Sequence, residues 1–206
     1  LVALHLAVCR LQLGKVEEID HILKNMVKLA KDFKQETYTN TKAKLLTQCK
    51  TQKERDLMLN IAAYEMMYYW REIPSHPDKH GSIEKLTERM GPIPDIPIPD
   101  IQAAASIIYA NFIASSDREK ALELYTKASE MKKTIKFEKQ WIPFAYYELA
   151  NLEFQNNNHN VALRHLKNVL GTKSFPFDDV LKTRAKALEK LIMVKSMATP
   201  EMERKR

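Results

Sequence analysis

Glycine is scarce in this sequence: only 4 of its 206 residues are glycine. Phosphate-binding loops, dinucleotide-binding turns and nucleophile elbows need glycines at short, fixed spacing, because the backbone there adopts positive φ angles or approaches a ligand closely. Gly14, Gly81, Gly91 and Gly171 stand too far apart to form any of these motifs. The sequence therefore gives no support to a nucleotide-dependent enzyme or to an α/β-hydrolase.

Cysteines and long apolar runs are also few. Cys9 and Cys49 are the 2 cysteines, and they form no C-x-x-C pair. This is typical of a reducing compartment, so we expect a protein of the cytoplasm and also of the nucleus. No apolar stretch approaches the roughly 20 residues of a membrane-spanning helix. We interpret the apolar residues 1–8 as the first helix of a chain cut from a longer protein, because no basic lead or cleavage site accompanies them.

The sequence has an excess of positive charge, with 33 Lys and Arg against 26 Asp and Glu and a net charge of +7. Between Lys132 and Lys139 lysines cluster around Phe137 and ahead of Trp141, a mixture that single-strand nucleic-acid binders use. A nucleic-acid groove normally draws on several elements, whereas this is one connecting segment. We interpret it as a surface turn anchored by its two aromatic residues, and we do not expect nucleic acid as a partner.

Apolar residues recur at helical spacing almost everywhere, and no segment alternates with the two-residue period of a strand, so we predict an all-α fold. Four of the 9 prolines fall between residues 92 and 99, where they favour an extended linker. We therefore divide the chain into N-terminal hairpins with an aromatic helix (1–90), a proline-rich linker (91–100), two hairpins with a closing helix (101–197) and a charged tail (198–206).

Turn and cap signals give approximate helix boundaries. Gly14 is the expected turn between the first two helices, Ser116 to Glu119 reads as a capping box, and Gly171 fits a left-handed C-cap. The expected helices cover residues 4–13, 16–33, 34–60, 61–70, 101–114, the segment opened at 116–119, 143–154, 161–170 and a last one that starts at 177–179.

Three segments share a repeat in which a small or aliphatic residue follows a turn, a bulky residue stands four positions later and an apolar residue seven positions later. The three sets are Ile19, Leu23 and Met26; Ala121, Tyr125 and Ala128; and Ala162, Leu166 and Val169. This is the pattern of the second helix of a tetratricopeptide repeat. We predict an α-solenoid of divergent tetratricopeptide-like hairpins wound into a right-handed superhelix.

Two longer segments carry a closer resemblance. Residues 62–71 read Ala-Ala-Tyr-Glu-Met-Met-Tyr-Tyr-Trp-Arg, and residues 133–150 run from a basic stretch into Trp-Ile-Pro-Phe-Ala-Tyr-Tyr-Glu-Leu-Ala. Their order and placement resemble the C-terminal portion of the tetratricopeptide repeat protein 39 family, which includes the fungal inclusion-body-clearance proteins. The resemblance covers nearly all of residues 1–195. The resemblance implies that the natural protein is longer, and it implies no active-site residues for this sequence.

Other motifs have simpler interpretations. His76 and His80 have a spacing that can bind zinc, but Pro77 breaks the helix that this would need, so we expect an exposed loop. Pro94 and Pro97 match a short ligand pattern of proline-binding modules, although a stiff spacer is the interpretation we favour. The tyrosine- and methionine-rich helix at 64–70 is expected to be core.

We place the candidate site on the first helix of the third repeat, because such helices line the concave face of a solenoid. Helical spacing puts five side chains on one side of it, and these form a candidate peptide groove: Phe144, Tyr147, Asn151, Phe154 and Gln155. The alternative is that the closing helix, or a part of the protein outside this chain, covers that face.

The sequence therefore predicts a non-enzymatic scaffold or adaptor that binds other proteins. It predicts no catalytic residue, cofactor, metal or small-molecule substrate, because no motif for any of these is present. The alternatives are a basic helical module that binds acidic ligands such as nucleic acid or anionic lipid, and an enzyme without a recognisable motif.

Overall fold

The computed structural model describes residues 2–28, 34–71 and 91–203, together with four single positions between 81 and 88. Every regular element in these ranges is a helix, which confirms the all-α prediction. The elements are α1 (Val2–Gln12), η1 (Val16–Glu18), α2 (Ile19–Lys28), α3 (Lys34–Gln48), α4 (Gln52–Tyr69), η2 (Ile93–Asp95), α6 (Pro99–Ile113), α7 (Arg118–Glu130), η3 (Met131–Lys133), α8 (Trp141–Gln155), α9 (His159–Gly171) and α10 (Asp178–Glu203), where η marks a short 3-10 helix.

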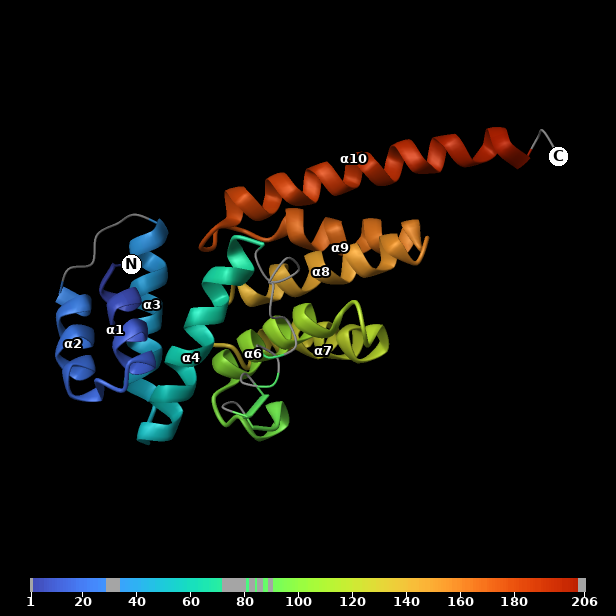
Figure 1. Cartoon of the computed structure of the whole chain (residues 1–206). Helices are drawn as coiled ribbons and strands as arrows, with labels where there is room; N and C mark the ends of the chain where they lie inside the picture. The colour runs from blue at the N-terminus through green and yellow to red at the C-terminus, as the bar shows by residue number, and fades with distance from the viewer. Residues whose placement is uncertain are drawn as a thin grey trace.

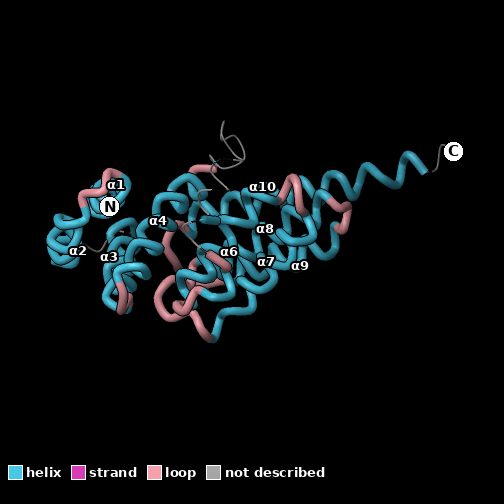
Figure 2. The backbone as a smooth tube through the Cα atoms, turned by 60° about the horizontal axis from the view of Figure 1, so that its bottom comes forward, coloured by secondary structure: helices cyan, strands magenta, loops and turns pink. Residues whose placement is uncertain are grey.

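Most helices that follow one another in the sequence pack against one another. The pairs α1–α2, α6–α7 and α8–α9 form hairpins, and α7 also packs on α8 and α9 on α10. In Figure 1, α1 to α3 form one group at the N-terminal end and α4 crosses between this group and α6. The same order is visible from the direction of Figure 2, where the C-terminal end of α10 projects beyond its neighbours.

The three small or aliphatic positions of the predicted repeat lie inside these hairpins. Ile19, Ala121 and Ala162 are buried on α2, α7 and α9, the second helix of each pair. A side chain as small as alanine lets two helix backbones approach closely, so the repeat pattern records where the hairpins touch.

The region expected to be one helix over 34–60 and another over 61–70 is divided differently. Helix α3 ends at Gln48, and α4 begins at Gln52 behind a capping box. The Glu54 N–H donates to the Thr51 hydroxyl at 3.2 Å, and the Thr51 N–H donates to the Glu54 carboxylate at 3.0 Å. Thr-x-x-Glu is the sequence signature of a helix N-terminus, so the sequence itself marks the start of α4.

Two predicted caps also differ in the structure. The N-cap of α7 is Asp117 and not Ser116, because the Asp117 carboxylate accepts from the Lys120 N–H at 3.0 Å. Gly171 is the last residue of α9 and does not take the left-handed conformation expected of it. Gly14 does adopt a positive φ, 72°, at the turn after α1.

The proline-rich segment 91–100 is partly helical. It holds the turn η2, and Pro99 is the first residue of α6, where a missing backbone N–H costs nothing. Ile96 is buried and Ile98 is half-buried, so this segment packs inward through its isoleucines.

A buried cluster of charged side chains links α3 and α4 to the connector that precedes α8. Lys42 on α3 makes an ion pair with Glu65 on α4, and its Nζ lies 2.7 Å from Glu138 Oε1 and 2.8 Å from Glu138 Oε2. The three side chains are at most 1% exposed. Tyr38 donates a hydrogen bond to Glu65, and Trp141 donates one to Glu138 at 3.4 Å. We call these five residues the sealed cluster.

An aromatic core surrounds the sealed cluster. Tyr69 stacks on Trp141 with ring centroids 5.6 Å apart, and Tyr68 meets Phe144 edge-on at 5.5 Å. The prediction that the helix at 64–70 is core is correct for Tyr68 and Tyr69, whereas Trp70 is 70% exposed. The aromatic core therefore fixes the C-terminal end of α4 against the N-terminal end of α8.

The buried carboxylate of Asp100 anchors the connector between η3 and α8. It accepts hydrogen bonds from the backbone N–H groups of Lys136, Phe137 and Glu138, at 3.2, 2.8 and 2.7 Å. These bonds satisfy backbone donors that would otherwise be costly to bury. They also hold Glu138 in place to meet Lys42.

Candidate functional site

The structure separates the five residues of the predicted peptide groove. Phe144 is 1% exposed and lies inside the aromatic core, against Tyr68, Tyr69 and Trp141. It does not lie on an open face, because the end of α4 covers it. Sequence periodicity identified its helix face, but not the helix from a distant part of the chain that packs on that face.

Two further groove residues also make internal contacts. Tyr147 is 7% exposed, and its ring lies under the guanidinium of Arg71, 5.8 Å from the ring centroid. Phe154 stacks on His159 with centroids 5.8 Å apart, and Lys195 of α10 lies 4.7 Å from its centroid. Phe154 thus faces α9 and α10 rather than the side that Asn151 faces.

Asn151 and Gln155 do line one concave site, which we call the inner hollow. It has a volume of about 230 Å³ and lies between α6 and α8, with the end of α4 at its edge. Its lining residues are Arg71, Asn111, Ala114, Ser115, Tyr125, Glu148, Asn151, Leu152 and Gln155.

An ion pair lies at the inner hollow. Arg71 Nη1 donates to Glu148 Oε1 at 2.8 Å, and the Tyr68 hydroxyl donates to the same oxygen at 3.0 Å. Asn151 Nδ2 donates to the other carboxylate oxygen at 3.2 Å. The Glu148 carboxylate raises the pKa of Arg71, so the guanidinium stays charged. Because Arg71 is 37% exposed and Glu148 only 7%, the cation is the partner that solvent reaches.

Primary amides occupy much of the remaining wall. Asn111 donates to the Ile107 carbonyl at 3.2 Å, and Gln155 accepts from Arg118 at 3.0 Å. An amide has two donor hydrogens and an acceptor oxygen, so each can serve a second partner as well. Three amides and a guanidinium around a small hollow match the donors and acceptors of an extended peptide backbone.

Arg71, Asn111, Tyr125 and Glu148 are site residues that the sequence interpretation did not select. Arg71 follows the end of α4 with a φ of 64°, an uncommon conformation for a residue with a side chain. Glu148 stands alone as a charge within the apolar face of α8, which is a usable signal for a buried ion pair. No sequence signal shows that Arg71 is its partner, since the two are 77 positions apart.

The basic connector has a different geometry from a nucleic-acid groove. Lys132, Lys133, Lys136 and Lys139 are exposed, but Trp141 is completely buried and cannot stack on a base. This agrees with its interpretation as a surface turn anchored by Trp141.

The part of the chain that the structure describes contains no group of three His, Cys, Asp or Glu side chains placed to hold a metal ion. His76 and His80 lie outside the described residues. None of the helices in the described ranges combines the length and apolar character that a bilayer crossing requires.

No family model, curated protein or solved structure matches this chain. The fold itself defines the class of protein: it is all-helical in the described residues, its helices pack in succession, and a polar hollow lies between α6 and α8.

Proposed function

We propose that this chain is a non-enzymatic, protein-binding scaffold, and that the inner hollow binds an extended segment of a partner protein. In this proposal the hairpins form a right-handed α-solenoid of tetratricopeptide type. The natural protein is a longer member of, or relative of, the tetratricopeptide repeat protein 39 family, and it acts in the cytoplasm or nucleus without a cofactor.

One observation carries the proposal: the inner hollow lies between α6 and α8, the first helices of two successive hairpins. In stacked helical repeats these helices form the concave face. The hollow offers Asn151, Gln155 and Asn111 as paired donors and acceptors above a fixed Arg71–Glu148 pair. A peptide backbone presents alternating N–H and C=O groups, and amides can bond to both.

The proposal is tested with peptides selected from a displayed random library against the whole chain. The double variant Asn151→Ala/Gln155→Ala removes two amides of the inner hollow together with their hydrogen bonds to Glu148 and Arg118, so its helicity is first compared with that of the original chain by circular dichroism. Each net hydrogen bond contributes about 1 kcal/mol, so the selected peptides should bind about 30-fold more weakly. Calorimetry or fluorescence anisotropy measures the change.

A matched control removes two amides elsewhere. Asn160 and Asn168 are exposed on α9, and Asn160→Ala/Asn168→Ala should leave the affinity within about twofold of the original chain. Equal affinities for the two double variants would contradict the assignment of the peptide to the inner hollow.

A further inference from the structure

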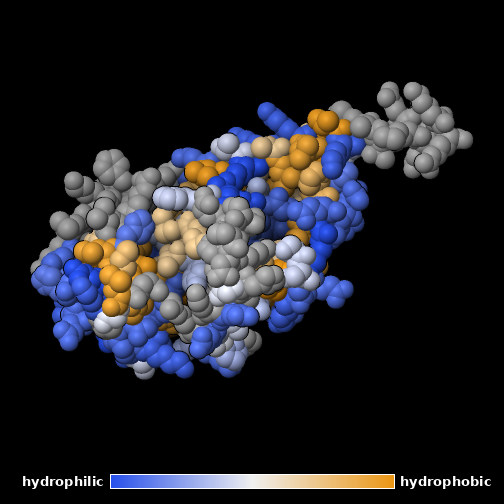
Figure 3. All heavy atoms as spheres, in the orientation of Figure 1, coloured by the Kyte–Doolittle hydropathy of each residue, from blue (hydrophilic) through white to orange (hydrophobic). Residues whose placement is uncertain are grey.

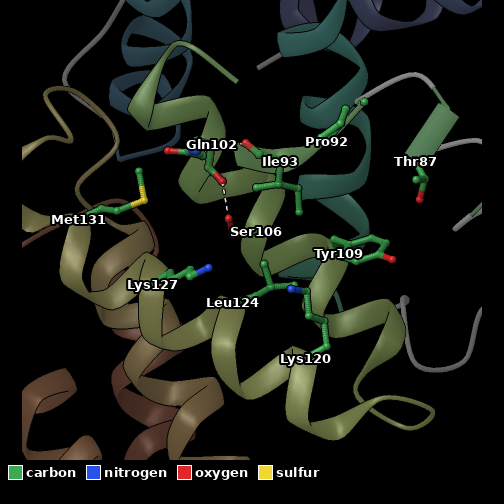
Figure 4. A pocket seen from close by; sticks show the side chains of 11 residues that line it. Thr87, Pro92, Ile93, Gln102, Ser106, Tyr109, Lys120, Leu124, Lys127 and Met131 are labelled. Carbon is green, nitrogen blue, oxygen red and sulfur yellow. Dashed lines mark hydrogen bonds between the residues drawn. The ribbon is translucent and has the colours of Figure 1, made fainter. Parts of the chain in front are cut away.

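A second cavity, separate from the inner hollow, lies between α6, α7 and the η2 turn, and we call it the outer pocket (Figure 4). Its volume is about 370 Å³, which falls within the range of small-molecule sites. Its lining includes Ile93, Gln102, Ser106, Lys120, Leu124, Lys127 and Met131.

The interior of the outer pocket is suited to an apolar group. Ile93, Leu124 and Met131 supply apolar surface to its walls. Two of the polar wall groups already bond to the backbone: Ser106 donates to the Gln102 carbonyl at 2.7 Å, and Gln102 Nε2 donates to the Ile93 carbonyl at 3.1 Å. Water inside therefore gains few hydrogen bonds from these walls, and its displacement by hydrocarbon is favourable.

Two lysines supply positive charge at the edge of this apolar space. Lys120 and Lys127 rise from α7, and Figure 4 shows their side chains directed toward the pocket. Both bind Glu123, with Nζ–Oε distances of 2.8 and 2.5 Å. Hydrogen bonds from Lys120 and then Lys127 lower the pKa of Glu123 to about 2, so it stays ionised. Within this group of three side chains two ammonium groups share one carboxylate, so its net charge is +1, and the Asp117 carboxylate acts on Lys120 more weakly than Glu123 does.

We propose that the outer pocket binds a medium-chain carboxylate, with the apolar chain between Ile93, Leu124 and Met131 and the carboxylate between Lys120 and Lys127. At about 30 Å³ for each heavy atom, the pocket holds about 12 such atoms. Decanoate has this size, and its single negative charge is opposite in sign to the net charge of Lys120, Glu123 and Lys127.

The probe is decanoate, titrated below its micelle-forming concentration into the whole chain by calorimetry. Decanol tests the charge, because it has the same chain length and no carboxylate, and acetate tests the apolar contact. We expect decanoate to bind at least about tenfold more tightly than decanol, and acetate to bind least. Equal binding of decanol and decanoate would overturn the proposal, as would a decanoate Kd above about 1 mM.

The variant Lys120→Gln/Lys127→Gln keeps the aliphatic stems and removes both charges. It should bind decanoate about tenfold or more weakly, with unchanged helicity by circular dichroism. Lys132→Gln/Lys139→Gln is the matched control, because it removes the same charge from exposed positions outside the pocket. Equal loss in both variants would show a general charge effect and would overturn the site.

The methyl resonances of methionine locate the bound chain independently of affinity. Met131 lines the outer pocket, whereas Met66 lines a separate cavity near the end of α4. Decanoate should shift the Met131 methyl signal and leave that of Met66 in place. A shift of Met66 alone would contradict the proposed position. Because peptide binding in the inner hollow is measured separately, either proposal can fail without the other.

Discussion

The sealed cluster and the inner hollow contain nearly the same chemistry in two different environments. In each, a cation pairs with a glutamate that also accepts a hydrogen bond from a tyrosine: Lys42, Glu65 and Tyr38 in one, and Arg71, Glu148 and Tyr68 in the other. The cations differ in exposure, 1% for Lys42 against 37% for Arg71. Because the residue types are so similar, the difference in burial decides which of the two cations a ligand can contact.

The two environments also differ in their charge balance. Lys42 faces two buried carboxylates, Glu65 and Glu138, so full ionisation would leave one negative charge without a partner. Burial raises the pKa of Glu138 to about 7, against the opposing effect of Lys42. The inner hollow pairs one cation with one carboxylate. We expect the sealed cluster to control stability and the inner hollow to control binding.

The largest effect should come from removing the buried cation. Lys42→Met leaves Glu65 and Glu138 in the core without a positive partner, which should lower the free energy of unfolding by about 3–5 kcal/mol. Arg71→Met, the corresponding change at the inner hollow, should cost less, about 1–2 kcal/mol, because the Glu148 carboxylate keeps its hydrogen bonds from Tyr68 and Asn151. Urea denaturation of both variants measures the difference.

A triple variant keeps the test informative if Lys42→Met does not fold. Adding Glu65→Gln and Glu138→Gln removes the unpaired charges, so this protein should regain part of the lost stability. Equal costs for Lys42→Met and Arg71→Met would show that burial does not distinguish the two regions.

A somewhat smaller effect should follow from pH. The folded-state pKa of Glu138, about 7, lies above its ordinary value of 4.5, so between these values the folded chain binds more protons than the unfolded chain. The free energy of unfolding should therefore fall by about 3 kcal/mol as the pH rises through this range. The charged or ionisable groups around Glu138 are Lys42, Glu65, Tyr38 and Tyr69.

Glu138→Gln is the control for this pH effect. The amide resembles the protonated carboxyl group, so the variant should lose the dependence that Glu138 causes. His5 and His165, whose pKa values burial lowers, are present in both proteins, and their contributions cancel in the difference. An unchanged pH slope in Glu138→Gln would contradict the assignment. Urea denaturation between about pH 4.5 and 8 measures both slopes.

Much of the helical fold could be predicted from the sequence. The 3.6-residue period of the apolar residues marks helices, and small residues at repeated positions such as Ala121 and Ala162 mark hairpin contacts. The missed break before α4 had the signature Thr51-x-x-Glu54. These features depend on residues close together in the chain, and local pattern is what sequence analysis detects.

The sites were harder to predict because they depend on distant contacts. Lys42 stands in a lysine-rich segment, and nothing marks it as the one that binds Glu138, 96 positions away. Phe144 belongs to the predicted face of α8, but the end of α4 covers it. Asn151 and Gln155 were selected and do line the inner hollow, because the part of their helix face that they occupy stays open.

The central claim, that the inner hollow is where a peptide binds, is tested most directly by site-specific cross-linking. A photoreactive benzoylphenylalanine replaces Gln155 in one protein and Asn168, on the exposed side of α9, in another. Each is irradiated with a peptide selected against the whole chain, and mass spectrometry measures the cross-linked fraction. We predict cross-linking from position 155 and none above background from position 168. Cross-linking from 168 alone, or equally from both positions, would contradict the claim.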